Sequence, residues 1–236
     1  MSRSPPMSFS QSFEKVFLFH CLPPESVARI QALCKWKRYE PGELILDYLD
    51  QSDDVFFITE GEARVSLYSM QGKAITFSDL VAGEMFGEIA AIDGAPRSAS
   101  IEARTACCIA SMSRPAFLQM LKSEPLVALE LLKHLVEKIR ALTTRVYEFS
   151  SLDVANRTRA ELLRLARLAP REGKSASIAP IPTHADIASR ISTHREAVTR
   201  EFNRLSKLGV IERLGGALVV KDIGRLEAMV QEASGE

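Results

Sequence analysis

The stretch FGEIAAIDGAPRSAS, residues Phe86–Ser100, decides how this sequence is interpreted. It places Glu88 and Arg97 nine residues apart, with a short apolar helical segment and a Gly-Ala-Pro turn between them. Predicted strands lie on both sides, so the stretch interrupts a β domain. A carboxylate and a guanidinium held together in this way suit either a buried ion pair or the two ends of one small ligand.

The β domain is predicted from six short segments rich in β-branched and aromatic residues, between about residues 40 and 112. They are ELILDY (43–48), VFFITE (55–60), ARVSLYS (63–69), AITFSDL (74–80), SASIEA (98–103) and ACCIASM (106–112). Gly42, Gly61, Gly72 and Gly83 separate them at the spacing of an antiparallel sandwich or barrel. A helix is predicted before them, from Glu25 to Lys35.

A long helix is predicted after the β domain, from about Leu126 to Leu152. It follows a shorter helix that Ser113 is expected to cap and Pro125 to end. An apolar stripe recurs along the long helix at alternating steps of three and four, which favours dimerisation against a partner helix. The stripe is Leu132, Leu135, Ile139, Leu142, Val146 and Phe149. A second apolar face is expected to pack on the β domain: Leu126, Val127, Leu129, Leu131 and Val136. The alternative is that the stripe also packs only on the chain's own β domain.

The C-terminal part has the pattern of a helix-turn-helix. Asp153 is the predicted N-cap of a helix over 154–169, and a loop is expected over 170–182. The segment 183–211 then has apolar and small residues at the spacing of two packed helices. The residues expected to face inward are Ile187, Ala188, Ile191, Val198, Phe202 and Leu205. The segment VIERLGGALVV (210–220) predicts a hairpin with glycines at its turn, a wing beside the helices.

The second of these helices carries the residues expected to read DNA. Arg195, Glu196, Thr199 and Arg200 share its exposed face near the N-terminal end, from which a recognition helix contacts bases. Arginine can donate to guanine, and glutamate can accept from cytosine. His194 and Thr183 complete the expected DNA contacts. The alternative is an ordinary surface helix in which Glu196 pairs with Arg200.

Charge supports a nucleic-acid partner for the C-terminal part alone. The whole chain has 30 basic and 30 acidic residues, but residues 156–213 carry 12 basic and 6 acidic ones. A basic excess of this kind attracts phosphates.

The sequence is not expected to be that of a membrane protein, a secreted protein, a metalloprotein or an enzyme. No apolar run approaches the ~18 residues of a membrane span, and the start MSRSPPMSFSQ lacks the apolar stretch of a signal peptide, so a cytoplasmic location is expected. The four cysteines form no metal-ligand spacing, and Cys107 and Cys108 are expected to be buried thiols. No nucleophile–base set appears, so neither an enzyme nor a metal site is expected. Asp53-Asp54 is interpreted as a solvated turn.

Taken in order, these elements resemble the cyclic AMP receptor protein (CRP/FNR) family of bacterial transcription regulators over nearly the full length. FGEIAAIDGAPRSAS is similar to the phosphate-binding cassette of cyclic-nucleotide-binding domains, LDV (152–154) to the family's hinge, and HREAVTREFNRL (194–205) to its recognition helix. The resemblance implies an α+β fold. A β-jelly-roll cyclic-nucleotide-binding domain (1–124) would precede a dimerisation helix (125–152) and a winged helix-turn-helix domain (153–236).

The chemistry of the cassette suits a cyclic nucleotide. Arg97 can bind the phosphate with charge-assisted hydrogen bonds, which are stronger than neutral ones, and Ser98 can donate to it. Backbone N–H groups from Gly87 through Ile89 and Ala90 add donors at the start of the short helix. Glu88 can accept from the ribose 2′-hydroxyl, as the resemblance also implies. The alternative is a buried Glu88–Arg97 ion pair that stiffens the barrel.

The identity of the base is left open between cyclic AMP, which is favoured, and cyclic GMP. The family's base contacts come from polar residues on the long helix. Counting back from Asp153 places them at Leu142 and Thr143, and a slip of one residue gives Thr143 and Thr144. Ser98, a hydroxyl beside the cassette arginine, resembles what cyclic GMP sites use. Ser192 stands where the helix-turn-helix turn usually has glycine, which costs about 1 kcal/mol if the turn needs a positive φ.

The resemblance implies a homodimeric regulator in which the nucleotide promotes allosteric binding to palindromic DNA with half-sites like TGTGA. RNA polymerase is the expected further partner of such an activator. A relative that senses iron–sulfur, haem or nitric oxide, or that needs no ligand, is the alternative. Cys21 and Cys34 are too few for a cluster, and His20 and His134 are expected at the surface or in packing. A kinase-type regulatory subunit would share the cassette but has no use for a helix-turn-helix.

Overall fold

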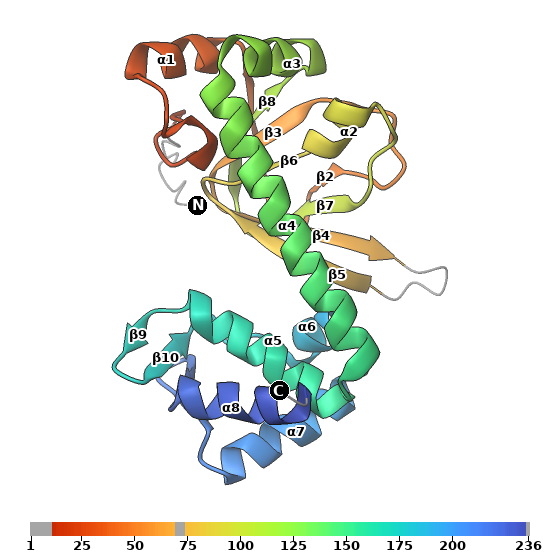
Figure 1. Ribbon diagram of the computed structural model, residues 1–236, viewed down its shortest axis with the longest axis vertical. Coiled ribbons are helices and arrows are strands. Elements are labelled where there is room, and N and C mark those ends of the chain that lie inside the picture. Colours follow the sequence, from red (N-terminus) through yellow and green to blue (C-terminus); the bar gives the residue numbers. More distant parts are fainter. Residues whose placement is uncertain (1–10, 69–73, 235–236) are drawn as a thin grey trace, which may run out of the picture. The chain divides into compact units, whose positions relative to one another are not determined.

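The computed structural model describes residues 11–68 and 74–234, which form two compact units (Figure 1). The N-terminal unit holds most of the chain up to Glu137, and the C-terminal unit begins at Lys138. The long helix α4 (Pro125–Ser151) runs through this boundary, so its first half belongs to one unit and its second half to the other. Each unit is described by itself.

Two four-stranded antiparallel sheets build the N-terminal unit. One has the order β1 (Lys35–Tyr39), β8 (Cys107–Met112), β3 (Val55–Glu60), β6 (Met85–Phe86), and the other β2 (Leu44–Leu46), β7 (Ser100–Ala103), β4 (Glu62–Tyr68), β5 (Ala74–Val81). Apolar side chains of both sheets meet in one core, which includes Ile58, Ile101 and Ile109. The six predicted strands are all present, and the prediction of a β-rich N-terminal domain is confirmed. Gly72 lies outside the described residues.

Two strands of this unit were not predicted, and the first predicted helix was too long. Helix α1 (Pro24–Ala32) ends before Lys35, where β1 begins. The β1 sequence KWKRY is mostly exposed and lies at the edge of its sheet, where charged side chains are tolerated and protect against aggregation. It therefore lacks the apolar content by which a buried strand is recognised. Strand β6 has only two residues, too few for any pattern.

A second core covers the other face of the first sheet. Helix α3 (Arg114–Ser123) and the first turns of α4 pack there with the N-terminal residues, through Phe13, Phe57, Met112, Phe117 and Val127. The ring of His134 lies 4.6 Å from that of Phe17, so His134 has the packing role that was expected. Ser113 is the N-cap residue of α3 as predicted, although its side chain makes no capping hydrogen bond.

Helix α4 differs from its prediction in which face is buried. Val127 and Leu131 are buried against the N-terminal unit and Leu135 is partly buried there, but Leu126, Leu129 and Val136 are exposed. The expectation that these three pack on the β domain is wrong, because only a narrow stripe with a spacing of four touches that domain. Leu135 belongs to this stripe and not to the outward seam. The exposed apolar residues then follow steps of three, four and three: Leu129, Leu132, Val136 and Ile139, with Leu142, Val146 and Phe149 beyond.

The C-terminal unit contains the predicted helix-turn-helix and wing. Its elements are α5 (Val154–Leu168), β9 (Arg171–Glu172), β10 (Ser175–Ile178), α6 (His184–Arg190), α7 (Arg195–Lys207), β11 (Ile211–Leu214), β12 (Ala217–Val220) and α8 (Ile223–Ser234). The side chain of Asp153 accepts a hydrogen bond from the Asn156 N–H at 2.8 Å, which confirms Asp153 as the N-cap of α5. All six residues predicted to face inward are buried in one core.

The segment expected to be a loop contains two strands. β10 pairs with β12 and β9, so the wing is part of a four-stranded sheet in the order β11-β12-β10-β9. Its small residues hide an alternating pattern in which Ala176 and Ile178 face the core. Ser192 in the turn between α6 and α7 has a φ of 52°, so the serine occupies the left-handed region that glycine tolerates better, at a cost of about 1 kcal/mol.

Candidate ligand-binding and DNA-binding sites

The cassette begins with a glycine that no other residue can replace without rearrangement. Gly87 has a φ of 83° and is the N-cap of the short helix α2 (Glu88–Asp93). A Cβ at this position would lie 2.8 Å from Arg97 Nη1 and 2.8 Å from the carbonyl oxygen of Asp54. Both the backbone conformation and the close approach of the guanidinium therefore require glycine.

The guanidinium of Arg97 is enclosed by oxygen atoms of the cassette and of the loop before β3. Its Nε–H donates to Ser52 Oγ at 3.0 Å, Nη1 to the Gly87 carbonyl at 3.0 Å, and Nη2 to the Asp54 carbonyl at 2.8 Å. The residue is 2% exposed. A buried cation with three directed hydrogen bonds has a fixed orientation, which is what recognition of a planar or tetrahedral anion needs.

The charge of Arg97 is balanced by carboxylates around it. Burial lowers the pKa of Arg97, whereas the charges of Asp50, Asp54, Asp53 and, last, Glu88 raise it. Glu88, at the start of α2, is also 2% exposed. The three guanidinium hydrogen bonds go to Ser52, Gly87 and Asp54, so the geometry of Arg97 is set by these oxygen atoms.

Ser52 and Asp54 are contacts that the sequence did not indicate. The loop that contains the Asp53-Asp54 turn, which was interpreted as solvated, also contacts the backbone of Arg97. The Arg97 N–H donates to the Asp50 carbonyl at 2.9 Å, and the Arg97 carbonyl accepts from the Leu49 N–H at 3.0 Å. Most of these partners are backbone carbonyls, which have no side-chain identity. No residue pattern could therefore have identified the carbonyl partners, and Ser52, which accepts through its hydroxyl, lies 45 residues from Arg97 in the sequence.

The remaining cassette residues differ in exposure. Ala90 is buried, whereas Ile89 and Ser98 are exposed, so the Ser98 hydroxyl is accessible to a ligand. These residues belong to the N-terminal unit. The three residues expected to contact the base, Leu142, Thr143 and Thr144, belong to the C-terminal unit.

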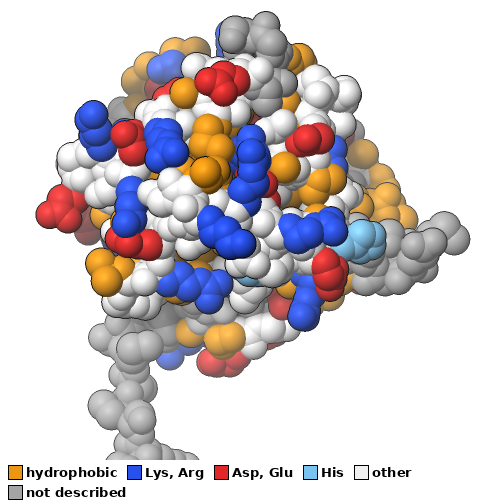
Figure 2. Space-filling view, turned by 90° about the horizontal axis from the view of Figure 1, so that it is seen from below, with side chains coloured by type: hydrophobic (Ala, Val, Ile, Leu, Met, Phe, Trp, Pro, Cys, Tyr) orange, Lys and Arg blue, Asp and Glu red, His pale blue; other side chains and the backbone are white. Residues whose placement is uncertain are grey.

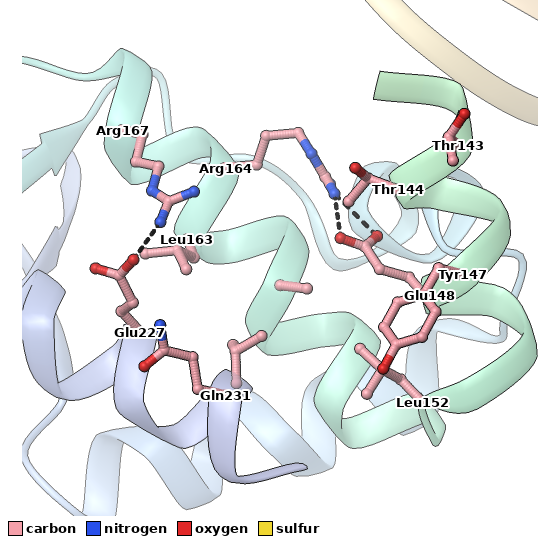
Figure 3. Close-up of a pocket in the computed structure, with 12 residues that line it drawn as sticks. Thr143, Thr144, Tyr147, Glu148, Leu152, Leu163, Arg164, Arg167, Glu227 and Gln231 are labelled. Carbon is pink, nitrogen blue, oxygen red and sulfur yellow. Dashed lines mark hydrogen bonds and ion pairs between the residues drawn. The ribbon is translucent and has the colours of Figure 1, made fainter. Parts of the chain in front are cut away.

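The two threonines line a pocket of about 590 Å³ between the end of α4, α5 and α8 (Figure 3). Thr143 Oγ1 donates to the Ile139 carbonyl at 3.0 Å and Thr144 Oγ1 to the Arg140 carbonyl at 3.1 Å. Each hydroxyl therefore retains lone pairs to accept a hydrogen bond. Leu142 is exposed and can offer only apolar contact.

Two ion pairs cross the walls of this pocket. Arg164 of α5 donates to both carboxylate oxygens of Glu148 on α4, at 2.7 and 2.9 Å, and Arg167 lies 2.5 Å from Glu227 of α8 (Figure 3). Apolar side chains, among them Leu152, Leu163 and Val230, form the rest of the lining. The sequence did not indicate this pocket, because the residues of its walls are up to 88 positions apart, from Thr143 on α4 to Gln231 on α8.

The predicted base-reading residues lie together at the N-terminal end of α7. Arg195, Glu196 and Arg200 are exposed, and His194 is exposed at the N-cap position. Arg195 Nε lies 3.4 Å from Glu196 Oε1. Because both side chains of this pair are largely exposed, the interaction is weak and each can turn to another partner.

Four further residues belong to this surface. The Nδ1 of His184 is 2.7 Å from Thr199 Oγ1, and its Nε2 is 3.5 Å from Arg213 Nη2 on the wing. Burial, and then the charges of Arg213 and Arg195, lower the pKa of His184. The Thr183 hydroxyl forms a capping box with Asp186, so its hydrogen bonds serve α6. His184 and Arg213 were not predicted, since only the packing of α6 against α7 and the wing brings them together.

The outer face that includes this surface is rich in basic side chains. Lys and Arg side chains are spread over much of it, with fewer Asp and Glu side chains between them (Figure 2). This agrees with the basic excess of residues 156–213. Such a surface attracts a polyanion over a broad area before any specific contact forms.

In residues 11–68 and 74–234, no group of three or more His, Cys, Asp and Glu side chains is placed to hold a metal ion. None of the four cysteines forms a disulfide. Cys107 and Cys108 are buried as expected, and burial raises the pKa of Cys34 to about 12. None of the described helices has the length and apolar character needed to cross a bilayer.

Comparison with known proteins gives matches for both halves of the chain. Residues 36–124 match the cyclic nucleotide-binding domain, and residues 156–229 match the Crp-like helix-turn-helix domain. The cyclic AMP receptor protein of Thermus thermophilus is 27% identical over 212 residues, which cover 89% of this chain and 94% of that protein. The CRP-like cAMP-activated global transcriptional regulator of Mycobacterium tuberculosis is 23% identical over 210 residues, with 89% and 94% covered.

The fold is also found among solved structures. A mutant of CooA from Carboxydothermus hydrogenoformans superposes with a TM-score of 0.75 at 20% sequence identity. The match covers 86% of this chain and 90% of that one. At this identity the likeness concerns the fold alone.

Proposed function

Because this chain belongs to the CRP/FNR family of transcription regulators, we propose that it is a homodimer in which a cyclic nucleotide promotes binding to palindromic DNA. Cyclic AMP is the proposed ligand, with cyclic GMP as the alternative. The proposed domains are the nucleotide-binding domain (1–124), the dimerisation helix (125–152) and the DNA-binding domain (153–236). The observation that supports this most is the buried, directed guanidinium of Arg97 in the same cassette as the buried carboxylate of Glu88.

Arg97 has the donors that a phosphate needs. A guanidinium carries five N–H groups, and three of those of Arg97 hold Ser52, Gly87 and Asp54. One N–H on each Nη is left for the phosphate. The first-turn N–H groups of Ile89 and Ala90 and the exposed Ser98 hydroxyl are the proposed further donors.

Glu88 and the long helix are proposed to bind the rest of the nucleotide. A carboxylate is an acceptor only, which suits the ribose 2′-hydroxyl. The hydroxyls of Thr143 and Thr144 already donate to their own helix and can accept from an amino group of the base. Adenine and guanine both carry an amino group, so this contact alone does not separate the two ligands, and Leu142 adds only apolar contact.

Calorimetry with cyclic AMP, cyclic GMP and 2′-deoxy cyclic AMP tests the ligand proposal. We expect Arg97→Ala to weaken binding about 100-fold, since it removes two charge-assisted hydrogen bonds. Arg104→Ala is the matched control, because Arg104 is a barrel arginine that pairs with Asp79 at the surface. Thermal unfolding of each variant shows whether it is folded.

The 2′-hydroxyl contact has its own test. The wild-type protein should prefer cyclic AMP over its 2′-deoxy analogue, and Glu88→Gln should lose most of that preference. Changing the carboxylate and the 2′-hydroxyl singly and together forms a double-mutant cycle, which isolates the contact between these two groups. Wild-type protein that binds none of these nucleotides would refute the proposal in favour of a regulator with another effector or with none.

DNA binding is proposed through Arg195, Glu196 and Arg200 of α7, with half-sites like TGTGA. Thr183, His194 and Thr199 are proposed as supporting contacts, and RNA polymerase as the partner of the DNA-bound dimer. We expect Arg195→Ala to cost about 1–3 kcal/mol at one base position and to relax specificity there. Selection of binding sites from random DNA, with and without cyclic AMP, measures both the half-site and the effect of the ligand.

A further inference from the structure

A fully buried carboxylate lies at the meeting point of three helices in the C-terminal unit. The Glu161 side chain on α5 is inaccessible to solvent and faces three arginines. Its Oε2 contacts Arg164 of α5 and lies 3.2 Å from Nη2 of Arg145 on α4, and its Oε1 lies 3.5 Å from Nη1 of Arg190 on α6. Burying these charges costs free energy, which their mutual attraction offsets only when the partners are held in a defined geometry.

Arg145 makes a second contact within this cluster. Its Nη1 donates to the backbone carbonyl of Arg190 at 2.8 Å. Arg190 is the last residue of α6, and the carbonyls of a last helical turn lack partners within the helix. Arg145 therefore holds the end of α6 from the long helix, immediately before the turn through Ser192 that leads to the recognition helix.

We propose that Arg145 is the positioning residue through which the long helix sets the place of α6, and with it the recognition helix α7. The proposal rests on the proposed function, because it assigns the route by which a nucleotide would alter DNA binding. Thr143 and Thr144, the proposed base contacts, directly precede Arg145 on α4. A shift or rotation of α4 at the threonines therefore displaces the Arg145 guanidinium as well.

The geometry of the cluster separates this role from general stability. Without Arg145, Glu161 still has Arg164 and Arg190, so its charge stays compensated. A buried pair between α5 and α7 keeps these two helices packed together when Arg145 is removed: Arg159 Nε donates to Glu201 Oε1 at 2.6 Å. Glu148 also joins α4 to α5 through Arg164, but Arg145 extends the link to α6.

The test compares Arg145→Gln with Arg171→Gln in the full-length protein. Arg171 of β9 is also an arginine of the C-terminal unit, and its Nη2 donates to the backbone carbonyl of Arg167 at 3.3 Å, so the helix end it contacts is that of α5 and not that of α6. Fluorescence anisotropy gives the affinity for an operator with and without cyclic AMP. We expect the ratio of these two affinities to be about 5–150 in the wild type and in Arg171→Gln, as is usual for coupled sites, and to be within about twofold of one in Arg145→Gln. Cyclic AMP affinity without DNA should stay within about twofold of the wild type in both variants.

A second measurement does not depend on the ligand. Hydrogen exchange of peptides covering α6 and the following turn should be about tenfold faster in Arg145→Gln, since a charge-assisted hydrogen bond is lost, and unchanged in Arg171→Gln. Arg145→Gln with wild-type exchange and a wild-type ratio overturns the inference. Equal loosening in both variants overturns it too, because the effect is then a general loss of stability. If the operator affinity of the wild type is the same with and without cyclic AMP, while exchange is still faster in Arg145→Gln, the proposed function is refuted. The positioning role of Arg145 is then retained.

Discussion

His184 is a titratable residue at the expected DNA-binding surface, and its surroundings favour the neutral ring. Burial and the charges of Arg213 and Arg195 lower its pKa, so the unfolded chain binds a proton more readily than the folded one as the pH falls below about 6.5. Stability contributed in this way is present at neutral pH and is lost as the pH falls through that range.

We therefore expect the C-terminal unit to be less stable at pH 5.5 than at pH 7.5, and His184→Asn to reduce that difference. Asparagine can keep a hydrogen bond to Thr199 and cannot be protonated in this range. Urea unfolding of the full chain measures it: far-UV circular dichroism follows the helices, while fluorescence of Trp36, the single tryptophan, reports on the N-terminal unit. His20→Asn is the control, since His20 is an exposed residue of that other unit. An unchanged pH dependence in His184→Asn would contradict the expectation.

At the scale of single residues, the sequence predicted positions at which the residue type itself indicates the structural role. Gly87 was recognised as a glycine that lets the backbone approach a ligand, and Ser192 as a residue in a turn that usually has glycine; both have a positive φ. Ser52 and Asp54 were missed, since most of the bonds around Arg97 involve backbone carbonyls. His184 and Arg213 were missed because they are 29 residues apart and meet only after folding.

At the scale of elements, the long helix leaves an apolar surface that a single chain does not cover. Ile139 is 61% and Val146 is 65% exposed, on the side where apolar residues recur in steps of three and four. The same steps lead from Ile139 through Thr143 to Val146, so the threonine lies within this seam. A heptad pattern of this kind packs against an equivalent helix. This is the basis of the homodimer in the proposed function.

We expect Ile139→Glu to convert the dimer to a monomer at micromolar concentration, because two carboxylates would be forced together in an apolar seam. The fold of the chain should be unaffected, since Ile139 is already exposed in it. Ala141→Glu is the control, an exposed position about 200° around the helix from Ile139. Sedimentation velocity gives the masses. A dimer that persists in Ile139→Glu would place the interface elsewhere.

Secondary structure was predicted well where the apolar residues of a segment recur with a clear period. It was predicted poorly where contacts with the rest of the fold determine the structure of the segment. The long helix and the six longer strands have clear apolar periodicity. Strands β1, β9 and β10 were missed because edge position and small side chains remove that signal. The face of α4 that packs on the β domain was assigned too broadly, since apolar residues intended for a partner chain and for the chain's own core look alike in sequence.

At the scale of the whole molecule, the distribution of charge supports a division of roles. Residues 156–213 carry 12 basic and 6 acidic residues, whereas residues 1–155 carry 16 and 20. The acidic excess keeps the N-terminal part from binding the DNA backbone nonspecifically, so the polyanion is directed to the C-terminal part. Neutralisation of phosphates by that part predicts an operator affinity that falls steeply with salt.

The proposed dimer predicts how operators must be spaced. Two identical recognition helices related by a two-fold axis bind half-sites about 34 Å apart, one turn of DNA, so the second half-site is reached only on the same face of the duplex. Inserting five base pairs between the half-sites turns the second by half a turn, and the affinity should fall at least tenfold, toward that of a single half-site. The same five base pairs placed outside the operator provide the control. Gel-shift titration at fixed salt measures both, and Ile139→Glu, expected to be a monomer, should bind the two operators equally. An operator that tolerates the internal insertion would mean that the two recognition helices do not act as one rigid pair.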